Sequence, residues 1–370
     1  MSLKIGIVGL PNVGKSTLFN ALMKRAVAAA ANHPFTTIEP NIGVVDLPDE
    51  RLGKLAEIAK PEKIVPATVT FVDIAGIIKG ASQGEGLGNQ FLSHIREADA
   101  LAIVLRCFRN DNIIHVAGTV DPLEDAKVVL LELILADLST LQKRIDALAG
   151  DVRSGNKDAI IKNGLYSRLL SALENEQLAS TVPLLDEKAE APFLKELHLL
   201  TLKPILYVAN VSEEDADKTP EVIIQEWNLA PLYEQTPGKL MVISAKVEAE
   251  LAELDEAEVK EYLESLGLTE PGLNRLIRSG FDLLGLATYF TAGPMEVRAW
   301  TIKQGFMAPQ AAGVIHGDFE KGFIRAEVIA YEDYIALNGE QGAKQAGKMK
   351  SEGKDYLVAD GDVMHFRFNT

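Results

Sequence analysis

The chain has 370 residues, of which 47% are hydrophobic and 24% are charged, proportions that fit an ordinary globular protein with two or three domains. Its formal net charge of −16 argues against broad, non-specific binding to nucleic acid, because the phosphate backbone repels an acidic chain. Cys107 is the single cysteine, which excludes an internal disulfide and favours a reducing, cytoplasmic location, and no apolar stretch approaches the roughly 18 residues of a membrane span.

A phosphate-binding loop is predicted directly after the first strand, Lys4 to Val8. Residues 9–17 are GLPNVGKST and match the pattern G-x-x-x-x-G-K-[ST], which a helical pattern follows. The backbone N–H groups of such a loop surround phosphate oxygens, Lys15 adds a positive charge, and Ser16 offers a hydroxyl to Mg²⁺. The N-terminus of the following helix attracts the same anion. The alternative is a glycine-bearing turn that binds no ligand.

The next polar loop has the place of a nucleotide-sensing switch. An alanine-rich stretch, Ala26 to Ala31, is expected after the first helix, and NHPFTTIEPN then runs from Asn32 to Asn41. In a nucleotide switch a threonine at this place closes over Mg²⁺ and the γ-phosphate, and Thr36 and Thr37 are both available. We favour Thr37, with a plain turn as the alternative.

A second phosphate-sensing segment follows the predicted strand Val69 to Val72. The sequence DIAG begins there, in which Asp73 would hold Mg²⁺ through water and the Gly76 N–H would meet the γ-phosphate. This short motif is weak alone, but it gains weight downstream of a phosphate-binding loop. Ile77 stands where many GTPases place a water-orienting glutamine, and the glycine-rich residues 79–89 are expected to form a mobile loop.

A histidine is a candidate for orienting the attacking water. The buried strand expected at Leu101 to Leu105 leads to the polar loop Arg109 to Val116, which contains His115. An imidazole can orient or polarise water, and the alternative is a histidine at the surface or at a helix cap.

The periodicity changes between about Pro122 and Leu200 and predicts an antiparallel helical hairpin. Six apolar residues at spacings of 3, 4, 3, 4 and 3 form a heptad seam: Leu131, Ile134, Leu138, Leu141, Ile145 and Leu148. The chain turns within residues 150–158, and a second helical pattern follows through Leu165, Leu169 and Leu173. The basic residues of the hairpin are more often a solvated face than an RNA-binding patch.

The segment expected to contact the base departs from the GTPase pattern. The predicted strand Pro204 to Ala209 leads to NVSE, where GTPases have N-K-x-D and the aspartate binds N1–H and the N2 amine of guanine. Val211 replaces the lysine and Glu213 replaces the aspartate, which weakens the case for guanine. The alternative is that Glu213 binds guanine as the aspartate does.

A smaller α+β unit is expected from about Leu284. Strands are predicted at residues 297–302 and 322–330, and a turn followed by a strand at residues 360–368, with a short helix at residues 310–315 and a glycine- and lysine-rich loop at residues 339–354. Catalytic residue types do not cluster there, so the unit is predicted to be a recognition module. Five basic residues either contact RNA or are ordinary surface residues: Arg298, His316, Lys344, Lys348 and Lys350.

These motifs together resemble the YchF/Obg-like ATPase family over essentially the whole chain. The family implies a P-loop NTPase domain with a mainly parallel sheet at residues 1–121 and 201–283, an inserted helical hairpin at 122–200, and a β-grasp (TGS) domain at 284–370. It also implies hydrolysis of ATP in preference to GTP, use of Mg²⁺, and association with the ribosome. Thr36 stands where a cysteine is common, and the alanine-rich stretch is slightly longer than usual.

The resemblance also implies the roles of individual residues. Phosphate would be bound by Asn12, Val13, Gly14, Lys15, Ser16 and Thr17, and the base site would include Asn210, Val211, Glu213, Ser244 and Ala245. Mg²⁺ would be held by Ser16, Thr37 and Asp73, with His115, Lys15 and Gly76 acting in hydrolysis. Related NTPases that lack the glutamine often have an asparagine at the position of Asn12 that helps to bind K⁺ beside the phosphates.

Three other functions compete with an ATPase switch. They are a guanine-specific GTPase, a nucleotide-gated ribosome- or RNA-binding module with incidental hydrolysis, and, as a distant third, a metabolic kinase. No arginine finger is identifiable, so unassisted turnover of about 10⁻⁴ to 10⁻² s⁻¹ is expected, as in other switch NTPases.

Overall fold

The computed structural model describes residues 3–30, 41–74, 87–116, 118–235 and 239–369. Contacts divide the chain into two compact units. The first contains the described residues within Met1–Leu22, Glu39–Gly43 and Phe71–Leu273, and the second those within Met23–Ile38, Val44–Thr70 and Asn274–Thr370. Among the described residues no helix has the length and apolarity needed to cross a membrane.

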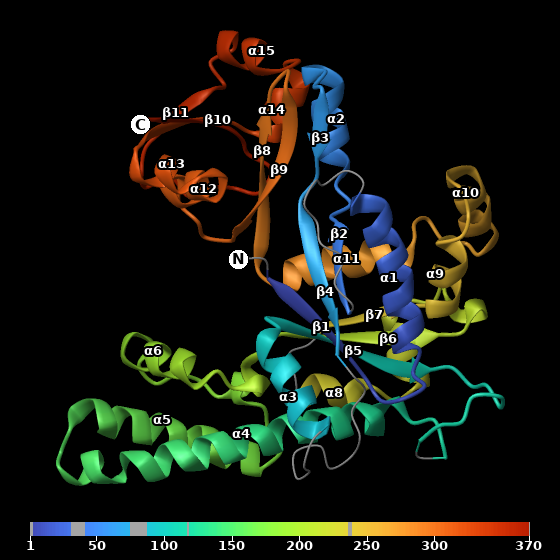
Figure 1. The fold of residues 1–370 in the computed structure, drawn as a ribbon, viewed down its shortest axis with the longest axis vertical. Helices are drawn as coiled ribbons and strands as arrows, with labels where there is room; N and C mark the ends of the chain where they lie inside the picture. Colours follow the sequence, from blue (N-terminus) through green and yellow to red (C-terminus); the bar gives the residue numbers. More distant parts are fainter. Residues whose placement is uncertain (1–2, 31–40, 75–86, 117, 236–238, 370) are drawn as a thin grey trace. The chain divides into compact units, whose positions relative to one another are not determined.

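The first sheet has the strand order β2-β4-β1-β5-β6-β7, and the pairings β1·β5, β5·β6 and β6·β7 are parallel (Figure 1). Its central strands are continuous apolar runs, and every residue of β5 is buried, as expected for a parallel sheet covered on both faces. The predicted α/β class with a mainly parallel sheet is therefore confirmed. The strand bounds are Lys4–Val8 (β1), Ile42–Asp46 (β2), Thr68–Asp73 (β4), Ala100–Cys107 (β5), Ile205–Val211 (β6) and Lys239–Ile243 (β7).

The first helix is longer than the sequence suggested. Helix α1 spans Lys15–Ala30, so most of the alanine-rich stretch that was expected after the helix continues it, in keeping with the high helix propensity of alanine. The other helices around the first sheet are α3 (Leu87–Glu97), α7 (Pro220–Glu226), α8 (Ala230–Gln235), α9 (Ala245–Leu251), α10 (Glu256–Ser265) and α11 (Gly272–Leu283), with 3₁₀ turns at Ala179–Thr181, Leu200–Leu202 and Glu213–Asp215.

The predicted helical hairpin is confirmed. Helices α4 (Pro122–Arg153) and α5 (Lys157–Glu174) lie side by side, and α6 (Glu187–Leu197) packs on α5 (Figure 1). Asp121 and Asn156 cap the two helices by accepting bonds from backbone N–H groups, which explains where each helix begins. The first position of the predicted seam is wrong, because Leu131 is 39% exposed while Leu130 and Leu133 are buried. Helix α4 also packs on β5, α8 and the 3₁₀ turn at Leu200–Leu202. Its buried residues therefore face several elements and not only α5.

The second unit is the expected α+β unit. Its sheet has the strand order β11-β10-β12-β8-β9-β3. On β12, Met364 and Phe366 are buried while His365 and Arg367 are exposed, which confirms the predicted alternation. The bounds are Leu286–Ala292 (β8), Glu296–Lys303 (β9), Phe323–Ile329 (β10), Lys350–Glu352 (β11) and Val363–Phe368 (β12), with helices Ala308–Ile315 (α12), Gly317–Lys321 (α13), Tyr331–Ala336 (α14) and Glu340–Gln345 (α15).

Two predictions about the second unit need correction. The glycine- and lysine-rich stretch at residues 339–354 contains α15 and β11, whereas a loop was expected; α15 packs on α14, and β11 pairs with β10, so tertiary contacts order this polar stretch. Residues 44–70 group with the C-terminal strands, although the sequence placed them in the nucleotide-binding domain. Strand β3 (Lys63–Val65) pairs in parallel with β9, and helix α2 (Glu50–Ala59) packs on β8 and β9. The three-domain division remains a prediction.

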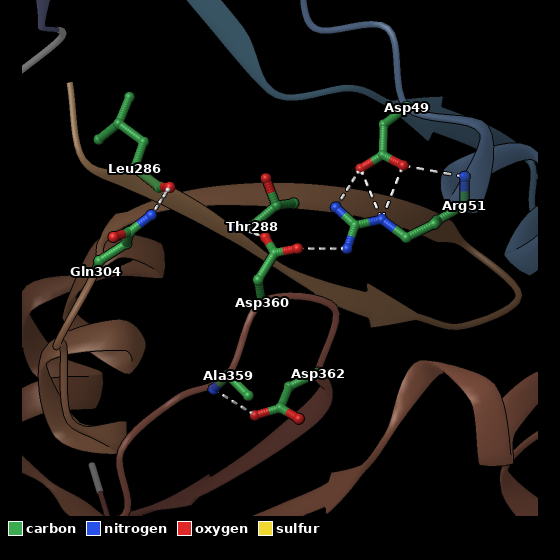
Figure 2. Close-up of polar contacts among 8 residues, drawn as sticks. All are labelled: Asp49, Arg51, Leu286, Thr288, Gln304, Ala359, Asp360 and Asp362. Carbon is green, nitrogen blue, oxygen red and sulfur yellow. Dashed lines mark hydrogen bonds and ion pairs between the residues drawn. The ribbon is translucent and has the colours of Figure 1, made fainter. Parts of the chain in front are cut away.

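An arginine attaches α2 to the C-terminal strands. The Arg51 Nη1 lies 2.6 Å from Asp360 Oδ2 and its Nη2 lies 2.7 Å from Asp49 Oδ2, so that the guanidinium lies between two carboxylates (Figure 2). Asp360 in turn accepts a bond of 2.7 Å from the backbone N–H of Thr288 in β8. The Arg51 guanidinium also lies 5.1 Å from the centre of the Phe290 ring. Burial opposes the charge, but the bonds to both carboxylates raise the pKa of Arg51 above its usual value.

Candidate functional site

A large cavity lies in the first unit, where the carboxyl ends of β1, β5 and β6 meet. Its volume is about 1490 Å³, and its lining comes from residues within the segments 10–17, 108–113, 210–215 and 245–253, together with Trp227. Crevices at this edge of an open parallel sheet are the usual place for a ligand. The structure therefore brings the predicted phosphate loop and the predicted base-contacting segments to one cavity.

Most of the predicted ligand-binding residues line this cavity. They are Asn12, Gly14, Lys15, Ser16, Thr17, Asn210, Val211, Glu213 and Ala245. Val13 and Ser244 are buried behind the cavity wall, with 0% and 3% of their surfaces exposed. Thr37 and Gly76, together with Thr36 and Ile77, lie outside the described residues. The sequence did not single out Phe108, Arg109 and Trp227, which also line the cavity and come from loops far apart in the chain.

The phosphate loop has a backbone that glycine makes possible. Gly14 has a φ of 91°, and a Cβ atom at this position would lie 2.1 Å from Asn210 Nδ2, so both conformation and space require glycine. Asn12 also has a positive φ of 64°, which asparagine tolerates better than most residues. The Leu18 N–H donates to the Gly14 carbonyl at 3.0 Å, which continues the helix directly out of the loop.

Asn210 connects the phosphate loop to the loop after β7. Its Nδ2 donates to the Val13 carbonyl at 2.8 Å, and its Oδ1 accepts from the Ala245 N–H at 2.9 Å. The side chain is buried, with 3% exposed, and the amide has a second N–H beyond the bond to Val13. Asn210 therefore has a structural role, since it connects the phosphate loop to the start of α9. The predicted contact with adenine stays a prediction.

Lys15 and Asp73 form an ion pair beside the phosphate loop. Lys15 Nζ donates to Asp73 Oδ1, and 10% of the lysine side chain and 18% of the aspartate side chain are exposed. The Asp73 N–H donates to the Asn41 carbonyl at 2.9 Å, which fixes the end of β4. Mg²⁺ in such sites takes most of its ligands from phosphate and water. The Ser16 hydroxyl and the Asp73 carboxylate are hard oxygen donors that suit this ion.

His115 is buried against a carboxylate and does not line the cavity. Its Nε2 lies 3.0 Å from Asp125 Oδ2, and 3% and 5% of the two side chains are exposed. Burial raises the pKa of Asp125, and the bond to His115 and the nearby charge of Arg106 oppose this rise. The sequence did not predict the carboxylate partner, because His115 lies in a loop and Asp125 lies in the first turn of α4.

Arg106 organises the loop that contains His115. This fully buried arginine of β5 donates through Nη2 to the carbonyls of Asn110 at 3.2 Å and Ile113 at 3.1 Å. From the other side, Asn12 Nδ2 donates to the Ile114 carbonyl at 3.1 Å. The loop is thus bound both to the core strand and to the phosphate loop. A charged residue inside the apolar run ALAIVLRC was the available signal, and the sequence analysis missed it.

Comparison with known proteins agrees with the geometry. Residues 4–136 match the family model MMR_HSR1, described as a 50S ribosome-binding GTPase, and residues 286–369 match YchF-GTPase_C, described as a protein of unknown function. Proteins named ribosome-binding ATPase YchF from Haemophilus influenzae and Bacillus subtilis are each 54% identical to this chain, over 369 and 373 residues that cover 100% of both partners. The structure of the YchF GTPase of Schizosaccharomyces pombe superposes with a TM-score of 0.86 and 38% identity, and the match covers 99% of this chain and 98% of the other.

Proposed function

The chain belongs to the YchF family of P-loop NTPases, and from this premise we propose that it is a Mg²⁺-dependent ATPase that prefers ATP to GTP and acts as a ribosome-associated switch. The main support is that one cavity is lined both by the phosphate loop and by Val211 and Glu213, which replace the lysine and aspartate of the guanine-binding motif. Adenine has neither the N1–H nor the N2 amine that the aspartate of that motif accepts.

A calorimetric titration tests the nucleotide preference. Non-hydrolysable ATP and GTP analogues are titrated with Mg²⁺ into the wild type and into Glu213→Asp. We expect the wild type to bind the ATP analogue more tightly, and Glu213→Asp to shift the preference towards GTP. A wild type that prefers GTP would replace the ATPase proposal with that of a guanine-specific GTPase, and the same P-loop would serve it.

In the proposed hydrolysis, Lys15 exchanges Asp73 for phosphate oxygens. The Lys15 ammonium and the N–H groups of the phosphate loop would stabilise the charge that spreads over the γ-phosphate, and the Ser16 hydroxyl and, through water, Asp73 would hold the metal. Mg²⁺, when bound, neutralises part of the phosphate charge. Thr37 and the Gly76 N–H are proposed to complete the site around the γ-phosphate. The ion pair between Lys15 and Asp73 keeps both groups at the place where the nucleotide binds.

We propose that the His115 side chain breaks its bond to Asp125 and then positions the attacking water. Because the His115 ring is bonded to Asp125 and lies outside the cavity lining, this role requires the bond between the two side chains to break. His115→Ala should lower the ATP hydrolysis rate by about 10²-fold or more, as loss of a general acid–base group does, without changing ADP affinity. Asn112→Ala, in the same loop, is the matched control. A His115→Ala variant with the wild-type rate would remove the role.

The same assay tests the proposed activation by K⁺. Asn12 donates an amide N–H to the Ile114 carbonyl, and its amide oxygen is the atom of this side chain that can ligate a cation. Hydrolysis should then be faster in K⁺ buffer than in Na⁺ buffer. Equal rates in the two buffers contradict the proposal.

The proposed partner is the ribosome, because relatives that match this chain from end to end are named for ribosome binding. The C-terminal unit, proposed to be a TGS domain of β-grasp fold, and the inserted hairpin are the candidate contact surfaces, and the protein would act in the cytoplasm. Co-sedimentation with ribosomes in ATP, in ADP and without nucleotide tests the switch. Binding that is tight but indifferent to nucleotide would favour a binding module whose hydrolysis is incidental.

A further inference from the structure

Both carboxylate oxygens of Glu213 already have donors from the protein. Lys246 Nζ lies 2.5 Å from Glu213 Oε2, and the Tyr262 hydroxyl lies 3.2 Å from Glu213 Oε1. The Glu213 side chain is 33% exposed, and the residue lines the cavity beside the proposed base site. The bond from Lys246 lowers the pKa of Glu213, which keeps the carboxylate ionised.

Tyr262 and Lys246 also contact a second carboxylate. The Tyr262 hydroxyl is bonded to Glu250 Oε2, and Lys246 Nζ lies 3.8 Å from Glu250 Oε1. The bond to Glu250, together with burial, raises the pKa of Tyr262, so the phenol stays protonated; its one proton is donated mainly to Glu250, and Glu213 Oε1 is the second, more distant acceptor at 3.2 Å. We call Glu213, Lys246, Glu250 and Tyr262 the Glu213 cluster.

The position of Tyr262 in the cluster is fixed by the core of the first unit. Tyr262 lies on α10, and its ring packs against a buried cluster formed by Ala216, Val247, Leu251 and Leu263. Lys246 begins the first turn of α9, which Asn210 connects to the phosphate loop through Ala245. Both donors to Glu213 therefore come from helices that are held in position: α10 packs on the core, and α9 is bonded to Asn210.

Guanine recognition by a carboxylate needs both oxygens turned towards the base. The N1–H and the N2 amine of guanine donate in parallel, one to each oxygen, whereas adenine has no donor at N1 or C2. An ammonium lies at one oxygen and a phenol at the other, and these two contacts hold the carboxylate turned towards Lys246 and Tyr262, so guanine would have to compete with both donors for its orientation. We propose that Lys246 and Tyr262 are specificity-determining residues that keep Glu213 from accepting guanine. This inference rests on the proposed preference for ATP.

The double variant Lys246→Met and Tyr262→Phe tests this proposal. Methionine keeps most of the apolar stem of lysine, and phenylalanine keeps the ring that packs on the core, so only the two donors are removed. Displacement of a fluorescent ADP by ATP and GTP analogues with Mg²⁺ measures both affinities. We expect GTP affinity to rise about tenfold, with ATP affinity changed by less than about threefold, which corresponds to the loss of about one competing hydrogen bond.

Two controls separate specificity from general effects. Lys260→Met removes an exposed lysine of the same α10 helix and should leave the ATP-to-GTP ratio unchanged. In a Glu213→Ala background the double substitution should no longer raise GTP affinity, because the carboxylate that it frees is absent. Tyr262→Phe alone preserves the packing and should raise GTP affinity by a smaller factor. This variant tests the proposal even if the double variant does not fold.

The wild-type protein in the same experiment distinguishes the two proposals. If the wild type prefers GTP, the proposed ATPase function fails. If the wild type prefers ATP, and both the double variant and Tyr262→Phe keep its ratio of affinities, then the role given to Lys246 and Tyr262 fails while the ATPase proposal stands.

Discussion

Replacing Lys15 with alanine should lower ATP hydrolysis by about 10²- to 10³-fold, the usual effect of removing one donor that stabilises charge in the transition state. Lys15 is the cation of the phosphate loop, and its side chain points to Asp73 at the end of β4, next to the cavity. The loop amides alone cannot balance the charge on the β- and γ-phosphates. Single-turnover hydrolysis and a nucleotide titration measure the loss of rate and of affinity.

The control for Lys15→Ala is Lys24→Ala, which removes an exposed lysine from the same helix, α1. The Lys15→Ala variant also leaves Asp73 without its ion-pair partner, so the double variant Lys15→Ala and Asp73→Asn is compared by thermal unfolding. If this double variant recovers the stability, the destabilisation of Lys15→Ala arises from the unpaired Asp73; the rate is read from Lys15→Ala alone, because Asp73 is itself a proposed metal ligand. A Lys15→Ala variant with the wild-type rate would contradict the placement of the phosphate site.

The largest single effect on stability is expected from Asp137→Ala. Asp137 is fully buried on α4, and its carboxylate accepts bonds from the Leu200 N–H at 2.9 Å, the Thr201 N–H at 2.8 Å and the Thr201 hydroxyl at 2.7 Å. Alanine leaves these buried donors without an acceptor, which should lower the free energy of unfolding by about 3 kcal/mol. Denaturant unfolding measures the change.

Two variants check the assignment to the buried carboxylate. Asp137→Asn keeps one acceptor oxygen and should lose less stability than Asp137→Ala. Asp146→Ala, on an exposed part of the same helix, should change stability by less than about 0.5 kcal/mol. Equal effects at positions 137 and 146 would contradict the role of the buried bonds.

The stability that depends on Asp137 should also vary with pH. Burial raises the pKa of Asp137 above its ordinary 3.8, against the bonds from Thr201 and Leu200, which lower it. The folded state therefore holds this proton more tightly than the unfolded state. The resulting stability is fully present below pH 3.8 and is lost as the pH rises through the raised pKa. Asp137→Asn should remove this part of the pH dependence.

Patterns confined to one stretch of the chain were predicted well. The P-loop match at residues 9–17, the apolar strands of the first sheet, the hairpin and the alternation on β12 all follow from neighbouring residues. Strand and helix periodicity depend on local backbone geometry, so these elements can be recognised without knowledge of their partners. Leu131 shows the limit, because a helix that packs on several elements has a buried stripe wider than one heptad seam.

The sequence by itself determined the phosphate loop, the order of the elements and the departure of NVSE from the guanine-binding motif, because each depends on residues adjacent in the chain. The tertiary structure alone decided three things: the burial of His115 against Asp125, the pairing of β3 with the C-terminal strand β9, and the engagement of Glu213 by Lys246 and Tyr262. The two strands, and likewise Glu213 and its two donors, lie tens to hundreds of residues apart in the chain. His115 and Asp125 are near in the chain but belong to a loop and to a helix. Such contacts form only when packing brings separate elements together, which no local pattern of residues specifies.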